Sequence, residues 1–272
     1  MVTMKLFLKL LRDIKPSFGQ FTAFVLVVAV GAFFYAGLVT YSNHLNAYAK
    51  DYFKEHNLSD LNVFYDRISQ QDVSDLSQLE GIRKAEGRYT FDAAQAFEGG
   101  KASLKIHSIP VHNEINTLAL IEGSLPSDKD EILLDSHYAK EHRYSVGDNI
   151  HIDTDAESFS FTVSGLGENV EHAKKNEIQD HKAYGVAYVA EEAVSEIAGG
   201  AYYNEIMIDA DDSYDIDELG KSIEERSKQS RLSYLDQVSK ERSFNYSQIH
   251  ETIYNNNLMS KVIPLVLFII EA

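Results

Sequence analysis

The sequence has no cysteine and no tryptophan, and only 4 of its 272 residues are prolines. Without cysteine the chain has no disulfide, no thiol nucleophile and no zinc site built on cysteine ligands. The enzyme motifs G-x-S-x-G, H-E-x-x-H and G-x-G-x-x-G are missing as well. Residues 99–101 resemble the end of a phosphate-binding loop, but Gln95 replaces its first glycine and Ala102 its serine or threonine. The sequence therefore predicts no catalytic and no cofactor-binding residue, and it favours a protein that binds or transmits over an enzyme.

A metal site is not predicted either. His137 and His142 are five residues apart and do not share a helix face. Three further histidines on or near predicted strands, like the rest, are predicted to lie at the surface: His107, His112 and His151. The acidic run at residues 209–218 has Tyr214 and Gly220 where a calcium loop needs glycine and glutamate. We predict a solvated turn from a strand into a helix there, because carboxylates favour a helix N-terminus.

Positive charge is scarce, with 25 Lys and Arg against 42 Asp and Glu, for a net charge of −17. Residues 1–17 carry +3 and residues 258–272 are balanced, which leaves −20 on residues 42–257. So acidic a segment repels nucleic acid, and a nucleic-acid partner is excluded. Basic residues before an apolar segment predict that the N-terminus stays in the cytoplasm and that the acidic domain lies outside.

The longest apolar run, residues 18–41, has no charged residue. As a helix, its residues 21–41 alone span about 30 Å, enough to cross a bilayer core. A cleaved signal peptide is the alternative, but its apolar core is about 7–15 residues long and ends in a small-x-small site. Residues 38–41 are a poor site of that kind, so we predict a retained transmembrane helix. Before it, residues 1–17 are predicted to form a cytoplasmic amphipathic helix with Lys5, Lys9 and Arg12 on one face.

Residues 42–257 show the mixed periodicities of an α+β domain. Two outer helices, residues 42–57 and 237–257, are predicted to join it to the apolar segments. Between them we expect a strand at 61–65, a capping box from Ser69 to Asp72, and one strand over 82–97 that forms a hairpin with 101–111. Further expectations are a turn at 120–126, strands at 131–134, 149–153, 159–163, 183–189 and 205–209, helices at 135–142, 191–198 and 215–228, and an exposed polar loop at 168–182.

The last segment, residues 258–272, turns apolar again, but its nine-residue run at 262–270 is too short to span a bilayer. It is predicted to be the start of a second transmembrane helix, truncated at Ala272. The alternative is an apolar tail that packs on the domain.

One stretch carries a resemblance, because several residues occur in a specific order. They are Gly123 and Pro126, then Glu131, Ile132, Leu133 and Leu134, then Ala139, Gly147, Asp148, Val163 and Gly165. This order resembles the extracytoplasmic core domain of FtsX-like ABC transporter permeases, the group that includes the MacB and LolC/LolE types. The layout is similar too: a basic helix, one span, a large outer domain and a second span.

The resemblance implies a multi-pass permease subunit in the cell membrane without an ATP site of its own. It implies an ATPase subunit and a second permease copy as partners, and an extracellular peptide, lipid or protein as substrate. ATP binding on the partner would move the spans and, with them, the outer domain. Two other classes share the layout: a two-span sensor of the chemoreceptor or sensor-kinase type with a ligand-binding outer domain, and an anchored binding or adhesion module.

Overall fold

The computed structural model describes residues 15–172 and 180–271, which fall into two compact units. The first unit, here called the helical unit, is formed by residues up to Asp51 and from Gln248 onward. The second, the outer domain, comprises Tyr52–Ser247. The predicted amphipathic helix lies almost wholly outside the described residues, since only the short turn η1 (Lys15–Ser17) belongs to it.

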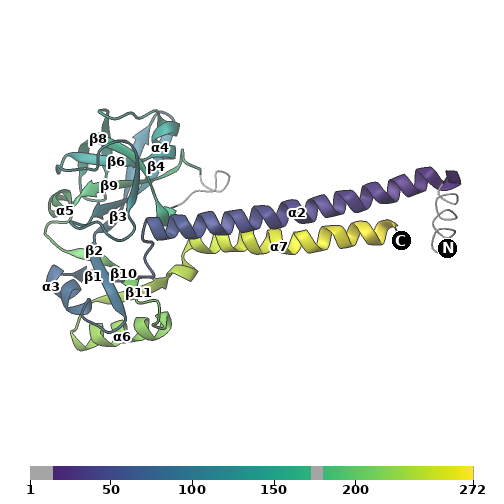
Figure 1. Ribbon diagram of the computed structural model, residues 1–272. Coiled ribbons are helices and arrows are strands. Elements are labelled where there is room, and N and C mark those ends of the chain that lie inside the picture. The colour runs from purple at the N-terminus through teal and green to yellow at the C-terminus, as the bar shows by residue number, and fades with distance from the viewer. Residues whose placement is uncertain (1–14, 173–179, 272) are drawn as a thin grey trace. The chain divides into compact units, whose positions relative to one another are not determined.

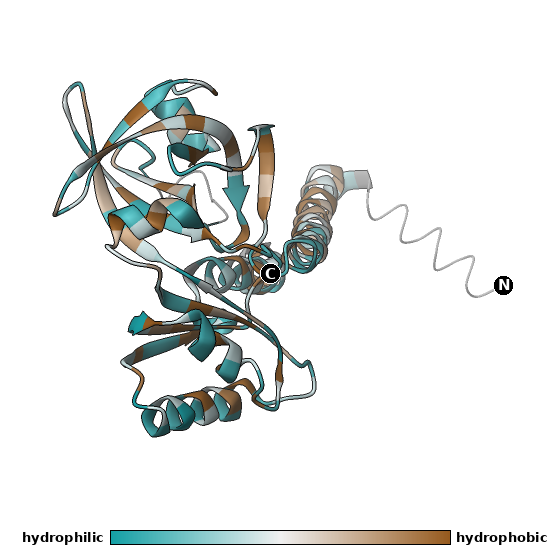
Figure 2. Cartoon of the chain, turned by 90° about the vertical axis from the view of Figure 1, so that its left-hand side faces the viewer, coloured by the Kyte–Doolittle hydropathy of each residue, from teal (hydrophilic) through white to brown (hydrophobic). Residues whose placement is uncertain are grey.

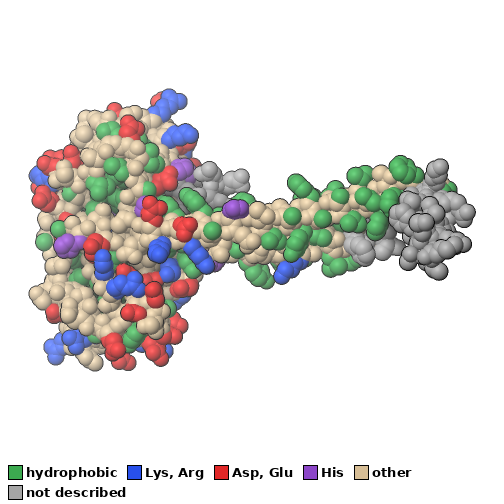
Figure 3. All heavy atoms as spheres, in the orientation of Figure 1, with side chains coloured by type: hydrophobic (Ala, Val, Ile, Leu, Met, Phe, Trp, Pro, Cys, Tyr) green, Lys and Arg blue, Asp and Glu red, His purple; other side chains and the backbone are tan. Residues whose placement is uncertain are grey.

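The helical unit contains most of α2 (Phe18–Glu55) and most of α7 (Phe244–Glu271), which run side by side (Figure 1). Among the described residues, α2 is the helix that is long and apolar enough to cross a membrane. Its apolar side chains are largely exposed along the pair (Figure 3). Gly31 of α2 faces α7, because a Cβ there would lie 3.6 Å from Pro264 Cα. The single helix α2 covers both the predicted span and the helix expected to follow it.

The outer domain contains two sheets in two lobes (Figure 1). The base lobe is an antiparallel four-stranded sheet in the order β11-β1-β10-β2, packed against α3 (Gln70–Leu76) and α6 (Ile216–Gln229). Its strands are β1 (Leu61–Ile68), β2 (Ile82–Arg88), β10 (Tyr203–Ala210) and β11 (Tyr234–Ser239). In Figure 2, α6 at the bottom shows teal and brown stretches, as expected of a helix that buries Leu219 and Ile223 and exposes its other face.

The distal lobe is a seven-stranded sheet in the order β5-β8-β6-β9-β4-β3-β7, with an added β7–β8 pairing that closes it on itself. Its strands are β3 (Thr90–Phe97), β4 (Gly100–Ile109), β5 (Leu118–Gly123), β6 (Glu131–Asp135), β7 (Asn149–Asp153), β8 (Ser158–Asn169) and β9 (Tyr184–Ala190). The helices α4 (Ser136–His142) and α5 (Glu191–Ile197) pack on its core. The predicted α+β class is confirmed.

Several local predictions are also confirmed. Ser69 and Asp72 form the capping box of α3, with each side chain bonded to the other's backbone. Asp135 caps α4 by accepting from the backbone N–H of His137 and Tyr138, both at 3.0 Å. Such caps satisfy N–H groups that have no partner inside a helix.

Two glycines of the resembled segment, Gly123 and Gly165, lie opposite each other where β5 pairs with β8. Gly123 has φ +78°, and a Cβ there would lie 2.2 Å from Ser164 O. A Cβ on Gly165 would lie 2.4 Å from Ser124 O. Only glycine fits two backbones that approach this closely, and only glycine adopts such a φ without strain.

Four boundaries were predicted wrongly. Residues 82–97 are not one strand, because β2 and β3 belong to different sheets. The expected turn at 120–126 begins after β5, which ends at Gly123. Strand β8 continues past Gly165 to Asn169, since it pairs with both β5 and β6. The last helix starts at Phe244, because Tyr234–Ser239 pairs with β1 as β11.

Candidate functional site

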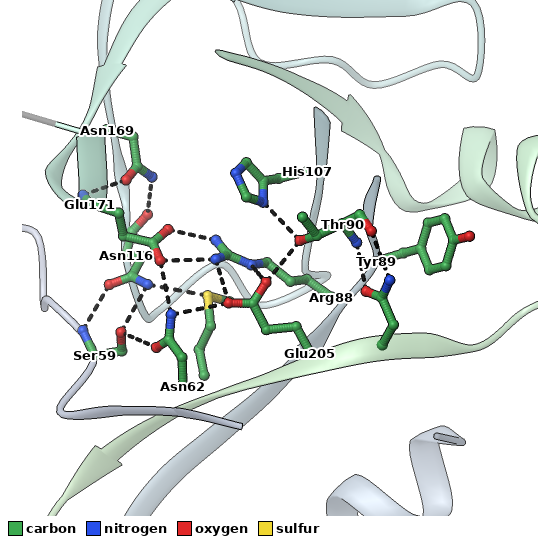
Figure 4. Close-up of polar contacts among 12 residues, drawn as sticks. Ser59, Asn62, Arg88, Tyr89, Thr90, His107, Asn116, Asn169, Glu171 and Glu205 are labelled. Atoms are coloured by element: carbon green, nitrogen blue, oxygen red, sulfur yellow. Dashed lines mark hydrogen bonds and ion pairs between the residues drawn. The ribbon is translucent and has the colours of Figure 1, made fainter. Parts of the chain in front are cut away.

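A cluster of buried polar side chains forms where the chain passes from one lobe to the other (Figure 4). Arg88 is the last residue of β2 and Thr90 the first of β3, so one residue separates the two sheets. Glu205 lies opposite Arg88 on β10. Glu171 comes from η2 (Val170–His172), directly after β8. The cluster thus joins the base lobe, the crossing strand and the end of the distal lobe.

The guanidinium of Arg88 forms paired hydrogen bonds with both carboxylates. Its Nε and Nη2 donate to Glu205 at 2.8 and 2.7 Å, and its Nη1 and Nη2 donate to Glu171 at 2.6 and 2.8 Å. The three side chains are 5%, 3% and 11% exposed. Bidentate geometry of this kind gives the strongest protein ion pairs.

The charges in the cluster shift one another's pKa values. Burial lowers the pKa of Arg88, but the two carboxylates outweigh burial and raise it well above its ordinary value. Burial likewise raises the pKa of Glu171, and attraction to Arg88 outweighs that effect, so the pKa ends below its ordinary value. Arg88 and Glu171 therefore stay charged at neutral pH.

One cation faces two carboxylates, and neutral donors complete the cluster. Asn62 Nδ2 donates to Glu171 at 3.1 Å and to Glu205 at 3.0 Å. Thr90 Oγ1 donates to Glu205 at 2.8 Å. Because carboxylate oxygens only accept hydrogen bonds, these contacts stabilise the extra negative charge.

Two histidines extend the cluster. Because the Thr90 hydroxyl donates to Glu205, it accepts from His107 Nδ1, 2.8 Å away. His107 Nε2 lies 3.2 Å from His172 Nε2; with a neutral His107 that donates from Nδ1, this Nε2 is the acceptor and His172 Nε2 the donor. His107 was predicted to lie at the surface, and this is wrong, since it is 3% exposed.

Both histidines have lowered pKa values. Burial is the main cause for each, and Arg88 adds to it at His107. At His172, Glu171 partly opposes the effect of burial. Neutral imidazoles are therefore the native form, and protonation would break the relay of hydrogen bonds.

We expect acid to destabilise the outer domain near pH 6. An unfolded histidine takes up a proton below about pH 6.5, whereas the two buried ones resist it, so stability present above that pH is lost as the pH falls. Each contributes a slope of up to about 1.4 kcal/mol per pH unit, so up to about 3 kcal/mol is lost between pH 7.5 and 5.5. Urea unfolding followed by circular dichroism measures this loss. The variant His107→Asn/His172→Asn should flatten the profile, while exposed His112→Asn should not; an equally steep profile in the double variant would contradict the assignment.

Beside the cluster is a pocket of about 280 Å³. Lys105, Lys240 and Asn245 line it together with the cluster residues. Lys105 pairs with Asp92 at 2.9 Å, and Lys240 pairs with Asp60. Since the charged groups already have partners, the geometry suits a structural joint that holds segments of the chain together. We call the cluster centred on Arg88, Glu171 and Glu205 the joint.

The first residues of the segment predicted as an exposed loop (168–182) in fact build part of this joint, namely residues 169–172. Asn169 is 4% exposed, and its Nδ2 donates to Asn116 O at 3.0 Å. Its Oδ1 accepts from Glu171 N at 2.6 Å, while Asn116 Oδ1 accepts from Ser59 N at 2.7 Å. These amides tie the end of β8 to the residues before β1 and β5. The polar composition of the segment concealed that Asn169 and Glu171 are buried and hydrogen-bonded.

The other residues considered for metals do not come together. His142 at the end of α4 contacts Lys182 O at 3.0 Å, far along the helix from His137 at its start. In the acidic run, Asp215 accepts from the N–H of Asp217 and Glu218 and caps α6, so the predicted strand-to-helix turn is confirmed. Within residues 15–172 and 180–271, no group of three or more His, Asp or Glu has a metal-binding arrangement.

The fold and the joint define the class of protein: a two-lobed α+β domain that follows a long apolar helix in the chain. Residues 21–226 match the family described as the MacB-like periplasmic core domain, and the chain belongs to this family of ABC transporter permease domains. The resemblance drawn from the residues between Gly123 and Gly165 is thereby confirmed. Comparison with functionally curated proteins gives no match.

Solved structures with similar folds include three bacterial domains. The extracellular domain of the noncanonical ABC-type transporter YknZ from Gram-positive bacteria has 11% identity and a TM-score of 0.45, covering 65% of this chain and 99% of that one. The periplasmic region of MacB from Actinobacillus actinomycetemcomitans has 15% identity and a TM-score of 0.44, covering 72% and 92%. A domain of a putative permease protein from Porphyromonas gingivalis has 13% identity and a TM-score of 0.42, covering 70% and 97%.

Proposed function

We propose that this chain is part of a non-catalytic permease subunit of an ABC transporter of the FtsX/MacB type. It would couple ATP hydrolysis by a partner ATPase to movement of its outer domain. A second permease copy would complete the complex in the cell membrane, with the N-terminus in the cytoplasm and residues 42–257 outside. Residues 258–272 would begin a second span, and the substrate would be an extracellular peptide, lipid or protein.

The observation that carries this proposal is the continuity of α2. It runs without a break for 38 residues, about 57 Å, from its apolar half into the outer domain. After the last strand of the domain, α7 likewise continues without a break from Phe244 into the C-terminal apolar segment. A helix resists bending because each turn is bonded to the next, so it can pass on a tilt or a shift. We name residues 42–55 and 244–257 the stalks.

The chain connects both stalks to the same lobe. Strand β1 follows α2, and β11 precedes α7, and these two strands pair directly in the base lobe. A relative movement of the stalks would therefore act on neighbouring strands. Membership in the permease family supports this use of the layout over the two-span sensor.

Spin labelling of the intact transporter tests the proposal. These 272 residues have no cysteine, so Lys101→Cys at the exposed hairpin between β3 and β4 takes a single label once any cysteines elsewhere in the full-length protein and its partners are replaced by serine. The full-length protein is tagged and purified from its native membrane with its bound partners. We expect a Walker-motif ATPase to copurify, and the distance between labels on the two copies to change when ATP binds. Copurification of a kinase or signalling module, with no response to ATP, would support the sensor instead.

A further inference from the structure

A second pocket in the outer domain, of about 340 Å³, shares no lining residue with the pocket beside Arg88. Its size is at the small end of the range for ligand sites, about 300–1,000 Å³. Its walls come from β2, β10, α5 and the connection that follows β4. The residues include Ala85, Glu86, Val111, Glu191, Ala201 and Tyr203.

Two carboxylates line this pocket without a cationic partner. Glu86 is only 7% exposed, and its oxygens accept from the backbone N–H of Glu114 at 3.1 Å and of Ile115 at 3.0 Å. Glu191 Oε1 accepts from the Tyr203 hydroxyl, but its Oε2 is buried and has no hydrogen-bond partner. In the described part of the chain, neither carboxylate forms an ion pair with lysine or arginine. Leaving the buried Oε2 of Glu191 without a partner is costly, and a cation bound there would remove that cost.

The basic groups nearby do not supply that cation. Lys84, two residues before Glu86 on β2, pairs instead with Glu114 at 3.0 Å. His112 lines the pocket but is exposed to solvent. This pocket of about 340 Å³ therefore attracts cations, because two glutamates line it and the net charge of residues 42–257 is −20.

Part of the lining is apolar. The Tyr203 ring lies on the backbone of Gly87, where a Cβ would come within 2.4 Å of the ring. Ala85 and Ala201 add small apolar surfaces, and Val111 adds a larger one. A short carbon chain ending in a cation suits such walls, because methylenes gain from burial and an aromatic face attracts the charge.

We propose that this pocket binds an alkylammonium group, from either a lysine side chain of a polypeptide or a free aliphatic amine. Glu191 contacts the ammonium, Glu86 supplies a second negative charge, and the Tyr203 ring flanks the carbon chain. This inference goes beyond the coupling function and does not depend on it.

Fluorescence titration of the full chain in detergent tests the proposal. The chain has no tryptophan, so Val111→Trp, at a side chain that is 81% exposed, places one reporter at the pocket. The probes are n-butylammonium chloride and its uncharged counterpart n-pentanol. We expect a saturable change in emission with the ammonium and none with the alcohol. Equal responses to both would overturn the proposal, as would no saturable response to the ammonium.

Two glutamates next to each other on α5 provide matched variants in the Val111→Trp background. Glu191→Gln removes the charge that lines the pocket, while Glu192→Gln removes the same charge from an exposed position. We expect Glu191→Gln to weaken n-butylammonium binding by about tenfold or more, as for the loss of one charged hydrogen bond, and Glu192→Gln to leave it within about twofold. Equal weakening by both would reduce the effect to general charge attraction and overturn the site. Circular dichroism checks that each variant is folded.

Two further probes separate the sources of the ammonium. One is the capped tripeptide acetyl-Ala-Lys-Ala-amide, and the other is its norleucine analogue. Binding of the lysine peptide alone, at least as tight as that of n-butylammonium, assigns the site to a polypeptide. Binding of n-butylammonium without the peptide assigns it to a free amine. Binding of the norleucine peptide as tight as that of the lysine peptide would contradict a site for cations.

Discussion

Replacing Arg88 with methionine should lower the free energy of unfolding of the outer domain by about 3–5 kcal/mol. The variant leaves Glu171 and Glu205, which are 11% and 3% exposed, without their common cation. Two like charges then lie close together in a site that water hardly reaches, and both lose paired hydrogen bonds. Urea unfolding of the full chain, followed by circular dichroism at neutral pH, measures the change.

A second arginine on the same strand gives the control. Arg83 on β2 pairs with Asp209 and Asp212 at 3.3 Å, but its side chain is 46% exposed. Arg83→Met should therefore cost less than about 1 kcal/mol. Adding Glu171→Gln and Glu205→Gln to Arg88→Met should recover part of the loss, since the unpaired charges are then gone. The joint would be refuted as a main source of stability if Arg88→Met cost no more than Arg83→Met.

Proline at position 46 should abolish the ATP-driven movement of the outer domain. Asn46 lies in the stalk of α2, where proline removes one backbone hydrogen bond and clashes with the carbonyl four residues earlier. The local cost is about 3 kcal/mol, enough to kink the helix. The distance between labels at Lys101→Cys should no longer change with ATP. Ile249→Pro in the stalk of α7 should have the same effect.

The matched control is Asn46→Ala, which keeps the helix and should keep the movement. Near-ultraviolet circular dichroism should be the same in all variants, because both stalk positions lie outside the cores of the two lobes. A proline variant that responds to ATP like the parent would refute stalk coupling and leave the family assignment untouched.

Much of the fold could be predicted from local patterns. Caps such as Asp135 and the capping box at Ser69 depend on residues three or four positions apart, and the structure shows both. The alternation of Phe159 and Phe161 with polar residues identified β8, of which Phe161 is 3% exposed. The ends of β8 and β11 could not be found in this way, because partners far away in the sequence decide where a strand stops.

The joint could not be predicted from the sequence for the same reason. Glu205 looks like an exposed residue of an alternating strand, yet every residue of β10 except Asn204 is buried, because the strand has neighbours on both sides and a lobe above it. Glu171 looks like part of a solvated loop. Arg88 lies 83 residues from Glu171 and 117 from Glu205, so no spacing in the sequence links them. The signal that was available was Arg88 itself, the one charge within the short run from Gly87 to Thr90.

The strand order of the outer domain makes the distal lobe an insertion. Strands β1, β2, β10 and β11 form the base lobe, whereas β3 to β9 form the distal lobe and are continuous in sequence between β2 and β10. The chain enters and leaves that lobe at two neighbouring strands. The base lobe therefore keeps its strand pairing whatever the length of the segment between β2 and β10. In this chain the two ends of that segment are held together by the pair of Arg88 with Glu205.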